Sequence, residues 1–195
     1  MRYPNVIAAM NLAGPSAILY YLAGYLFSVL GAFIVICIVI RQVDSEEISA
    51  VAGLSQRSPI LALCLAMAMV SLAGIPPLAG FFGKFLLLRA LLERGALQPG
   101  FYWLAGVTIV GVVISFYYYL GIVRAIYWSK PLGSFSSPPL ALPTRWALAL
   151  CMAGMLFLGV YPNPMVRLSI RAASTLQPGG EQLRQASTDP FVPTF

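Results

Sequence analysis

The stretch that decides the fold is GIPPLAGFFGKF, residues 74–85. It lies in a long hydrophobic run, since no residue from Ser58 to Gly83 is charged and the first charged residue after Lys84 is Arg89. The prolines and glycines that precede the lysine interrupt a continuous helix. An ammonium at membrane depth costs about 2.5 kcal/mol or more, so it is usually kept for a pathway or a partner. The stretch therefore predicts a broken transmembrane helix beside a functional charge.

Composition places the chain in a membrane. Of its 195 residues, 59% are hydrophobic and 9% are charged, and the mean hydropathy is +0.84. A soluble domain carries about a quarter charged residues. The net charge of +6 suits a membrane surface. No basic cluster is interleaved with aromatic residues, so the sequence does not predict a nucleic-acid partner.

Cysteine and histidine usage argues against a metal or redox cofactor in this chain. The sequence has no histidine, and Cys37, Cys64 and Cys151 lie in apolar runs without paired spacing. Such cysteines are typically small buried hydrophobic residues. The glycine motifs of dinucleotide and phosphate sites do not appear. If the chain takes part in redox chemistry, we expect it to do so without binding a cofactor.

Four largely uncharged stretches run to about 20 residues or more, the length with which a helix crosses a bilayer. They extend over roughly Pro15–Ile40, Pro59–Glu93, Phe101–Tyr127 and Trp146–Tyr161. They predict an all-α polytopic transmembrane bundle of about four spans within residues 1–176, followed by a polar tail over 177–195. A segment rich in Pro, Gly and Ser, residues 130–143, predicts an extended loop. The distribution of basic residues does not settle the orientation.

The second stretch is too long for one straight span. A continuous helix over Pro59–Glu93 would rise roughly 50 Å, against a hydrocarbon core of ~30 Å. We predict two half-helices joined by an unwound piece, because proline removes a backbone donor and restricts the residue before it. The residues assigned to this break are Gly74, Pro76, Pro77 and Gly80.

Lys84 lies ten residues before Arg94, so about 15 Å inside one interface if that half is helical. Irregular backbone at this depth is tolerated only against protein or a water-filled cavity. We therefore expect Lys84 to border an interior, hydrated cavity. Burial disfavours the charged form of an amine, which would allow this lysine to relay protons. The alternative is a lysine that holds the unwound carbonyls or a nearby carboxylate and never titrates.

Hydroxyl groups on the first and third stretches are candidates for a polar pathway toward Lys84. These candidates are Tyr25, Ser28, Ser115, Tyr117 and Tyr118. The first two follow Tyr20 and Tyr21 at roughly helical spacing, which suits either a polar stripe or an interfacial anchor. The tyrosine cluster could join a chain of waters or pack between helices with its hydroxyls satisfied.

The residues around the break resemble a known family. The segment MVSLAGIPPLAGFFGKF, residues 69–85, resembles subunit N of bacterial NADH:quinone oxidoreductase, the antiporter-like subunit called subunit 2 in respiratory complex I. Supporting matches in the same order and spacing are AILYYL (17–22), LGAF (30–33), GL (53–54), RSP (57–59) and SFYYYL (115–120). The resemblance covers about residues 14–130.

The resemblance implies that Lys84 is the proton-relay lysine of a half-channel and that the chain corresponds to the C-terminal portion of the subunit. A fragment, a split gene product and a degenerate copy are all compatible with this. The implied partners are the lipid bilayer, the other membrane subunits and the missing N-terminal helices, in a bacterial inner (plasma) membrane. NAD, FMN, iron–sulfur clusters and quinone are expected in other subunits. The alternatives are a subunit of a sodium/proton antiporter or membrane-bound hydrogenase, and a non-conducting scaffold.

Overall fold

The computed structural model describes residues 4–43, 47–130 and 140–176, and every regular element in these ranges is a helix. In chain order they are α1 (Pro4–Val43), the 3₁₀-helix η1 (Ile48–Val51), α2 (Leu54–Arg57), α3 (Pro59–Ala73), α4 (Ala79–Gly95), α5 (Gly100–Trp128), α6 (Leu142–Val160) and α7 (Pro162–Leu176). The predicted all-α fold is confirmed.

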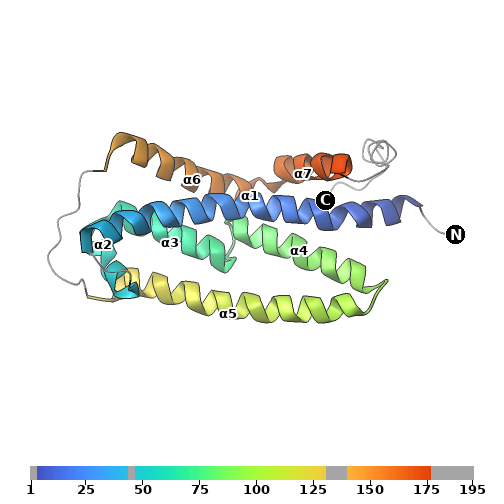
Figure 1. Ribbon diagram of the computed structural model, residues 1–195, viewed down its shortest axis with the longest axis horizontal. Helices are drawn as coiled ribbons and strands as arrows, with labels where there is room; N and C mark the ends of the chain where they lie inside the picture. Colours follow the sequence, from blue (N-terminus) through green and yellow to red (C-terminus); the bar gives the residue numbers. More distant parts are fainter. Residues whose placement is uncertain (1–3, 44–46, 131–139, 177–195) are drawn as a thin grey trace.

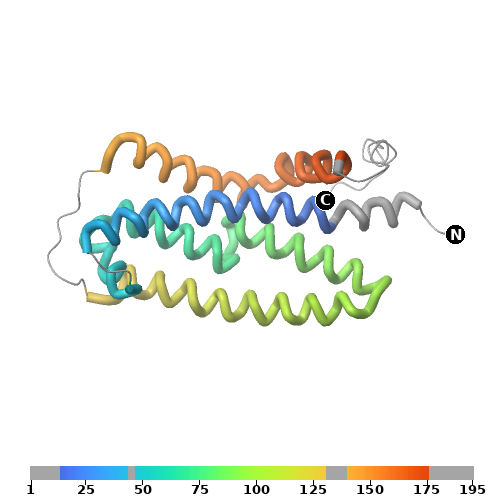
Figure 2. Tube along the Cα trace, viewed as in Figure 1, coloured from blue at the N-terminus to red at the C-terminus, as the bar shows by residue number. Residues whose placement is uncertain are grey.

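The long helices lie side by side in an elongated bundle (Figure 1). Helix α1 occupies the middle and contacts α3, α4, α6 and α7. Helices α3 and α4 follow one another along the bundle, and α5 packs against both of them (Figure 2). The largest fully buried side chains of the core include Val35 and Val39 from α1, Leu61 and Leu65 from α3, and Met155 from α6.

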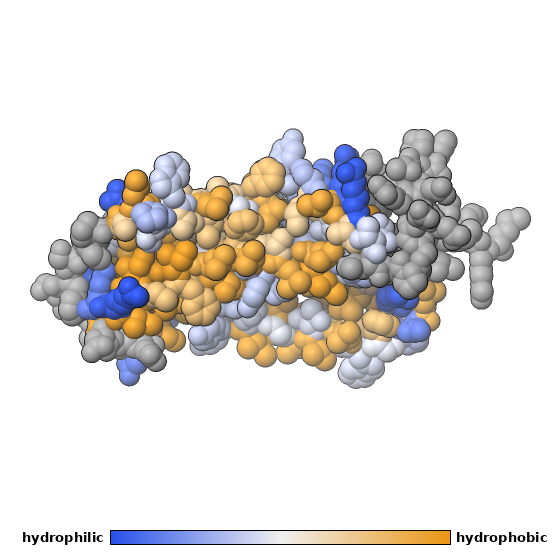
Figure 3. Space-filling view, turned by 45° about the horizontal axis from the view of Figure 1, so that its top comes forward, coloured by the Kyte–Doolittle hydropathy of each residue, from blue (hydrophilic) through white to orange (hydrophobic). Residues whose placement is uncertain are grey.

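Three of the described helices are long and apolar enough to cross a membrane: Gly14–Val43 within α1, then α5 and α6. A multi-pass membrane fold is thus confirmed, and one face of the molecule is mostly hydrophobic in its middle with hydrophilic residues toward its ends (Figure 3). The sequence predicted a fourth span over Pro59–Glu93. That stretch is divided between α3, with 15 residues, and α4, with 17, each shorter than the ~20 residues that a straight span needs. Their joint role as one discontinuous span stays a prediction.

Two helices go beyond the sequence prediction. Helix α1 begins at Pro4 rather than Pro15 and carries Pro15 inside it. Helix α7 was not predicted, because the prolines 162 and 164 after Tyr161 suggest the end of a helix, whereas proline is also well suited to the first turn of one. The predicted polar tail over 177–195, and residues 131–139 of the predicted loop, lie outside the described residues.

Candidate functional site

The break between α3 and α4 is built by glycine and proline. Helix α3 ends at Gly74, whose φ of 87° lies in the left-handed region that favours glycine. Its N–H closes the last turn by donating to the carbonyls of Val70 and Ser71. Pro76 and Pro77 follow without backbone donors, and α4 begins at Ala79. The gap between the two helices thus contains Gly74, Pro76 and Pro77, whereas Gly80, which the sequence also assigned to the break, lies in the first turn of α4.

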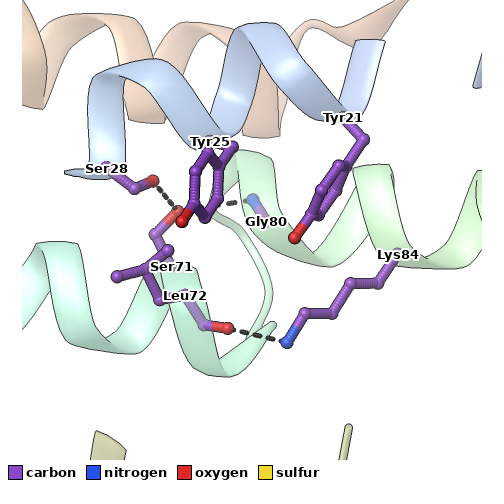
Figure 4. Close-up of a pocket in the computed structure, with 7 residues that line it drawn as sticks. All are labelled: Tyr21, Tyr25, Ser28, Ser71, Leu72, Gly80 and Lys84. Atoms are coloured by element: carbon purple, nitrogen blue, oxygen red, sulfur yellow. Dashed lines mark hydrogen bonds between the residues drawn. The ribbon is translucent and has the colours of Figure 1, made fainter. Parts of the chain in front are cut away.

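Lys84 reaches back across this break. Its Nζ donates to the carbonyl oxygens of Leu72, at 2.7 Å, and Ala73, at 3.3 Å (Figure 4). Both carbonyls belong to the last turn of α3, where a helix leaves carbonyls without intrahelical donors and favours a positive charge. Among the described residues, no carboxylate pairs with Lys84. The amine is therefore held by backbone carbonyls rather than by an acidic side chain.

A small cavity lies between α1 and the break (Figure 4). Its lining residues are Tyr21, Tyr25, Ser28, Ser71, Leu72, Gly80 and Lys84. Its volume of about 10 Å³ is close to the minimum for one water molecule. On one wall the hydroxyls of Ser28 and Ser71, both buried, lie 2.8 Å apart.

A larger cavity of about 320 Å³ adjoins the same lysine. It lies among α1, α3, α4 and α5, and its lining residues are Tyr21, Tyr25, Leu72, Lys84, Leu87, Thr108, Gly111, Val112, Ser115 and Tyr119. The volume is sufficient for several water molecules. Because Lys84 lines both cavities, it connects the break with a mostly apolar space whose lining includes several hydroxyl side chains.

The structure brings only part of the predicted polar pathway to this site. Tyr25, Ser28 and Ser115 line the cavities. Tyr117 and Tyr118 line neither, and their side chains are 85% and 55% exposed. A helix turns about 100° per residue, so adjacent tyrosines cannot all point the same way.

Sequence reasoning missed several lining residues. They include Ser71 on α3 and Thr108 on α5, whereas Tyr21 and Tyr119 belong to the tyrosine groups that the sequence had indicated. Thr108, Ser115 and Tyr119 are separated by seven and four residues, the spacing of one helix face. That stripe of hydroxyls would have identified which face of α5 borders the cavity.

Helix α6 packs directly against the break. A Cβ placed on Gly159 would lie 1.9 Å from the carbonyl oxygen of Pro77, so only glycine allows this approach. One residue earlier, the Leu158 carbonyl accepts a hydrogen bond from the Tyr20 hydroxyl of α1. Tyr20 thus turns toward α6 while Tyr21 turns toward Lys84.

No metal centre is formed within the ranges that the structure describes. No group of three Cys, Asp or Glu side chains there is placed to hold a metal ion. Cys64 and Cys151 are buried, as predicted, and the Cys64 thiol contacts the sulfur of Met152 at 3.0 Å. The expectation for Cys37 was wrong, because its side chain is exposed on α1.

The comparisons with known proteins agree on one family. Residues 4–115 match the family described as NADH:quinone oxidoreductase/Mrp antiporter, TM. The chain is 40% identical over 163 residues to NADH-quinone oxidoreductase subunit N of Desulfitobacterium hafniense, which covers 84% of this chain and 32% of that relative. These matches confirm the resemblance to subunit N. The chain spans about a third of the length of the curated relatives it matches.

Solved structures share the helical arrangement. A chain of respiratory complex I from Thermus thermophilus with bound aureothin aligns with a TM-score of 0.64 at 32% identity, covering 82% of this chain and 36% of that one. A chain of the Mrp complex from Dietzia sp. DQ12-45-1b aligns with a TM-score of 0.73 at 19% identity, covering 90% and 40%. At 19% identity, the match to the Mrp chain shows only that the two chains share a fold.

Proposed function

The chain belongs to the NADH:quinone oxidoreductase/Mrp antiporter transmembrane family, and from this premise we propose that it serves as a membrane subunit of a proton-translocating NADH:quinone oxidoreductase. In this proposal Lys84 is the residue that takes up and releases the proton. The observation that carries it is the position of the amine, which is bound to the free carbonyl end of α3 and lines a cavity of about 320 Å³.

The chemistry follows from the donors of a lysine. An ammonium has three N–H donors, and two of them are directed to the carbonyls of Leu72 and Ala73. The third is available to water in a cavity that the amine lines, so proton release is directed there. On α5 the Thr108 and Ser115 hydroxyls donate their protons to the carbonyls of Leu104 and Val112, so they can accept hydrogen bonds from water in the cavity, and the Tyr119 hydroxyl can both donate and accept.

The redox reaction would take place elsewhere in the assembly. We place NAD, FMN, the iron–sulfur clusters and quinone in other subunits, which would drive this chain from a distance. Its partners in the proposal are other membrane subunits and the helices that its longer relatives carry in addition. Large apolar side chains exposed on α5, such as Trp103 and Val107, need cover from such helices or from lipid. A bacterial inner membrane is the proposed location.

An antiporter subunit is the second candidate, because the family and the fold include Mrp complexes. The identities over the aligned structures favour the quinone oxidoreductase, with 32% to the complex I chain against 19% to the Mrp chain. Affinity purification of the tagged chain from its native membrane separates the two. Co-purification of an NADH-oxidising assembly supports the first candidate, and co-purification of other antiporter subunits supports the second.

The experiment that tests the relay is Lys84→Met in the assembled complex. Proton uptake into membrane vesicles is measured during NADH oxidation, and assembly is followed on native gels. Lys130→Met is the matched control, because Lys130 is the other lysine of the chain and is exposed beyond the end of α5. We expect pumping to be lost in the first variant and kept in the second. Full pumping by an assembled Lys84→Met complex would support the scaffold interpretation instead.

A further inference from the structure

We propose that Ser71 is a positioning residue, whose hydroxyl fixes the start of α4 against the last turn of α3 and thereby holds the Lys84 amine at its carbonyls. The inference rests on the proposed role of Lys84. Lys84 donates to the carbonyls of Leu72 and Ala73, the two residues that follow Ser71 in the chain.

The first observation is how α3 and α4 are aligned with one another at the break. The Gly80 N–H, in the first turn of α4, donates to the Ser71 hydroxyl at 3.3 Å. Lys84 lies four residues further on, one turn away on the same side of α4. One turn of α4 is thus bonded to α3 at both ends, first through Ser71 and then through Leu72 and Ala73. If the hydrogen bond between Gly80 and Ser71 is lost, the distance from the Lys84 amine to the carbonyls at the end of α3 is no longer fixed.

The close packing at this contact gives the second step. A Cβ on Gly80 would lie 1.8 Å from the Ser71 carbonyl oxygen, so the two backbones approach as near as glycine permits. The Ser71 side chain is fully buried at 0% exposure. Helix α4 has no capping side chain at its own N-cap residue, Leu78. Ser71 therefore supplies from another helix the oxygen that an N-cap side chain would usually provide.

Counting hydrogen-bond donors gives the third step. The single proton of the Ser28 hydroxyl is directed to the Gly24 carbonyl at 2.9 Å. Either hydroxyl can donate in the 2.8 Å contact between Ser28 and Ser71, and when Ser28 donates to Gly24 the donor is Ser71. In that arrangement the hydrogen bonds run from the Gly80 N–H through Ser71 to Ser28, as Figure 4 shows, and on to the Gly24 carbonyl, with each donor used once. Ser71 therefore ties three helices together at the break, through a buried network in which every proton has an acceptor.

The test measures the environment of the Lys84 amine directly. The full chain in lipid nanodiscs is labelled with acetic anhydride across the pH range in which amines titrate, and mass spectrometry gives the labelling rates of Lys84 and Lys130. The chain has only these two lysines, so the exposed Lys130 serves as an internal reference. In the unaltered protein we expect Lys84 to be labelled more slowly.

Ser71→Ala should raise the ratio of Lys84 to Lys130 labelling several-fold and change its pH profile. Ser71→Cys keeps the approximate size but offers only a weak acceptor, so it should act in the same direction if the alanine variant does not fold. Ser71→Thr, which keeps the hydroxyl, should restore the original ratio. Ser174→Ala is the matched control, because within the described part of the chain that buried hydroxyl donates to the Arg171 carbonyl of its own helix α7.

An unchanged ratio and pH profile in folded Ser71→Ala and Ser71→Cys would overturn the inference. An equal change in Ser174→Ala would do the same, because it would show a response to any lost buried hydroxyl. This readout does not depend on pumping. A Lys84→Met complex that still pumps would therefore remove the proposed relay without altering the labelling result.

Discussion

The Lys84 ammonium lies 2.7 Å from the Leu72 carbonyl oxygen, although a helix break separates the two residues in the chain. The end of α3 supplies uncapped carbonyls, and the first turns of α4 return a cation to them. An interrupted helix thus creates a polar site from its own backbone inside an apolar bundle. Among the described residues no carboxylate pairs with this amine, and a neighbouring carboxylate would stabilise the charged ammonium and so hinder release of its proton.

Lys84→Arg should abolish proton pumping while leaving assembly intact. A guanidinium can donate to the same carbonyls, but it stays protonated in proteins and so cannot release its proton. We expect NADH-driven proton uptake in vesicles to fall to the level of Lys84→Met, with an unchanged native-gel pattern. If the arginine variant pumps at the original rate, a fixed charge is sufficient and titration of this residue is not required.

Gly80→Ala should destabilise the bundle by about 1–3 kcal/mol, because its methyl group would collide with the Ser71 carbonyl and force the two helices apart. The thermal unfolding midpoint of the chain in detergent measures this, and it should fall by about 2–4 °C per kcal/mol. Gly106→Ala is the control, since nothing lies within 4 Å of the added atom on α5. Equal midpoints for the two variants would contradict the close approach at the break.

Lys84 could be singled out from the sequence because a charged side chain is rare within an apolar, membrane-spanning stretch. An isolated lysine after two prolines is visible without any structure, and α3 ends just before these prolines while Lys84 donates to its last turn. Tyr25 and Ser28 also lie as expected, since their spacing places them on one face of α1. Ser71 was not predicted, because a serine in an apolar helix usually bonds to its own backbone and its partner on another helix is set by packing.

The rotation of α5 could not be deduced from its tyrosines. Three consecutive tyrosines point in three directions, so Tyr119 lines the cavity while Tyr117 and Tyr118 do not. Helix α7 was missed for a different reason. Its two prolines lie in the first turn, where the missing N–H groups cost no hydrogen bonds, so a pattern that seemed to end one helix in fact begins another.

Arg57→Ala should cost about 1–3 kcal/mol of stability. The guanidinium donates to the carbonyls of Ala50, at 2.7 Å, and Ala52, at 3.0 Å, and thereby fixes η1 against α2. Its removal leaves those carbonyls without this donor at a partly buried position. Arg57→Lys should lose less, because an ammonium can still reach one carbonyl. Arg41→Ala, at an exposed site, is the control in the same thermal unfolding experiment, and a similar loss there would contradict a specific role.

Tyr20→Phe should destabilise the contact between α1 and α6, because the proline that begins α7 leaves a carbonyl of α6 without a backbone donor. In a continuous helix the Leu158 carbonyl would accept from the N–H four residues later, but that residue is Pro162, which has none. The Tyr20 hydroxyl, on a side chain with 0% exposure, donates to this carbonyl instead. Losing that donor at a buried acceptor should cost about 1–3 kcal/mol.

A double-mutant cycle tests this substitution of one donor for another. Pro162→Ala supplies a backbone N–H, so the penalty of Tyr20→Phe should be smaller in the Pro162→Ala background than in the original chain. Thermal unfolding in detergent gives the four stabilities, and Tyr161→Phe, at an exposed side chain, should be nearly neutral. Equal penalties in both backgrounds would mean that the hydroxyl does not compensate for the proline, and that the junction of α6 and α7 is held by packing alone.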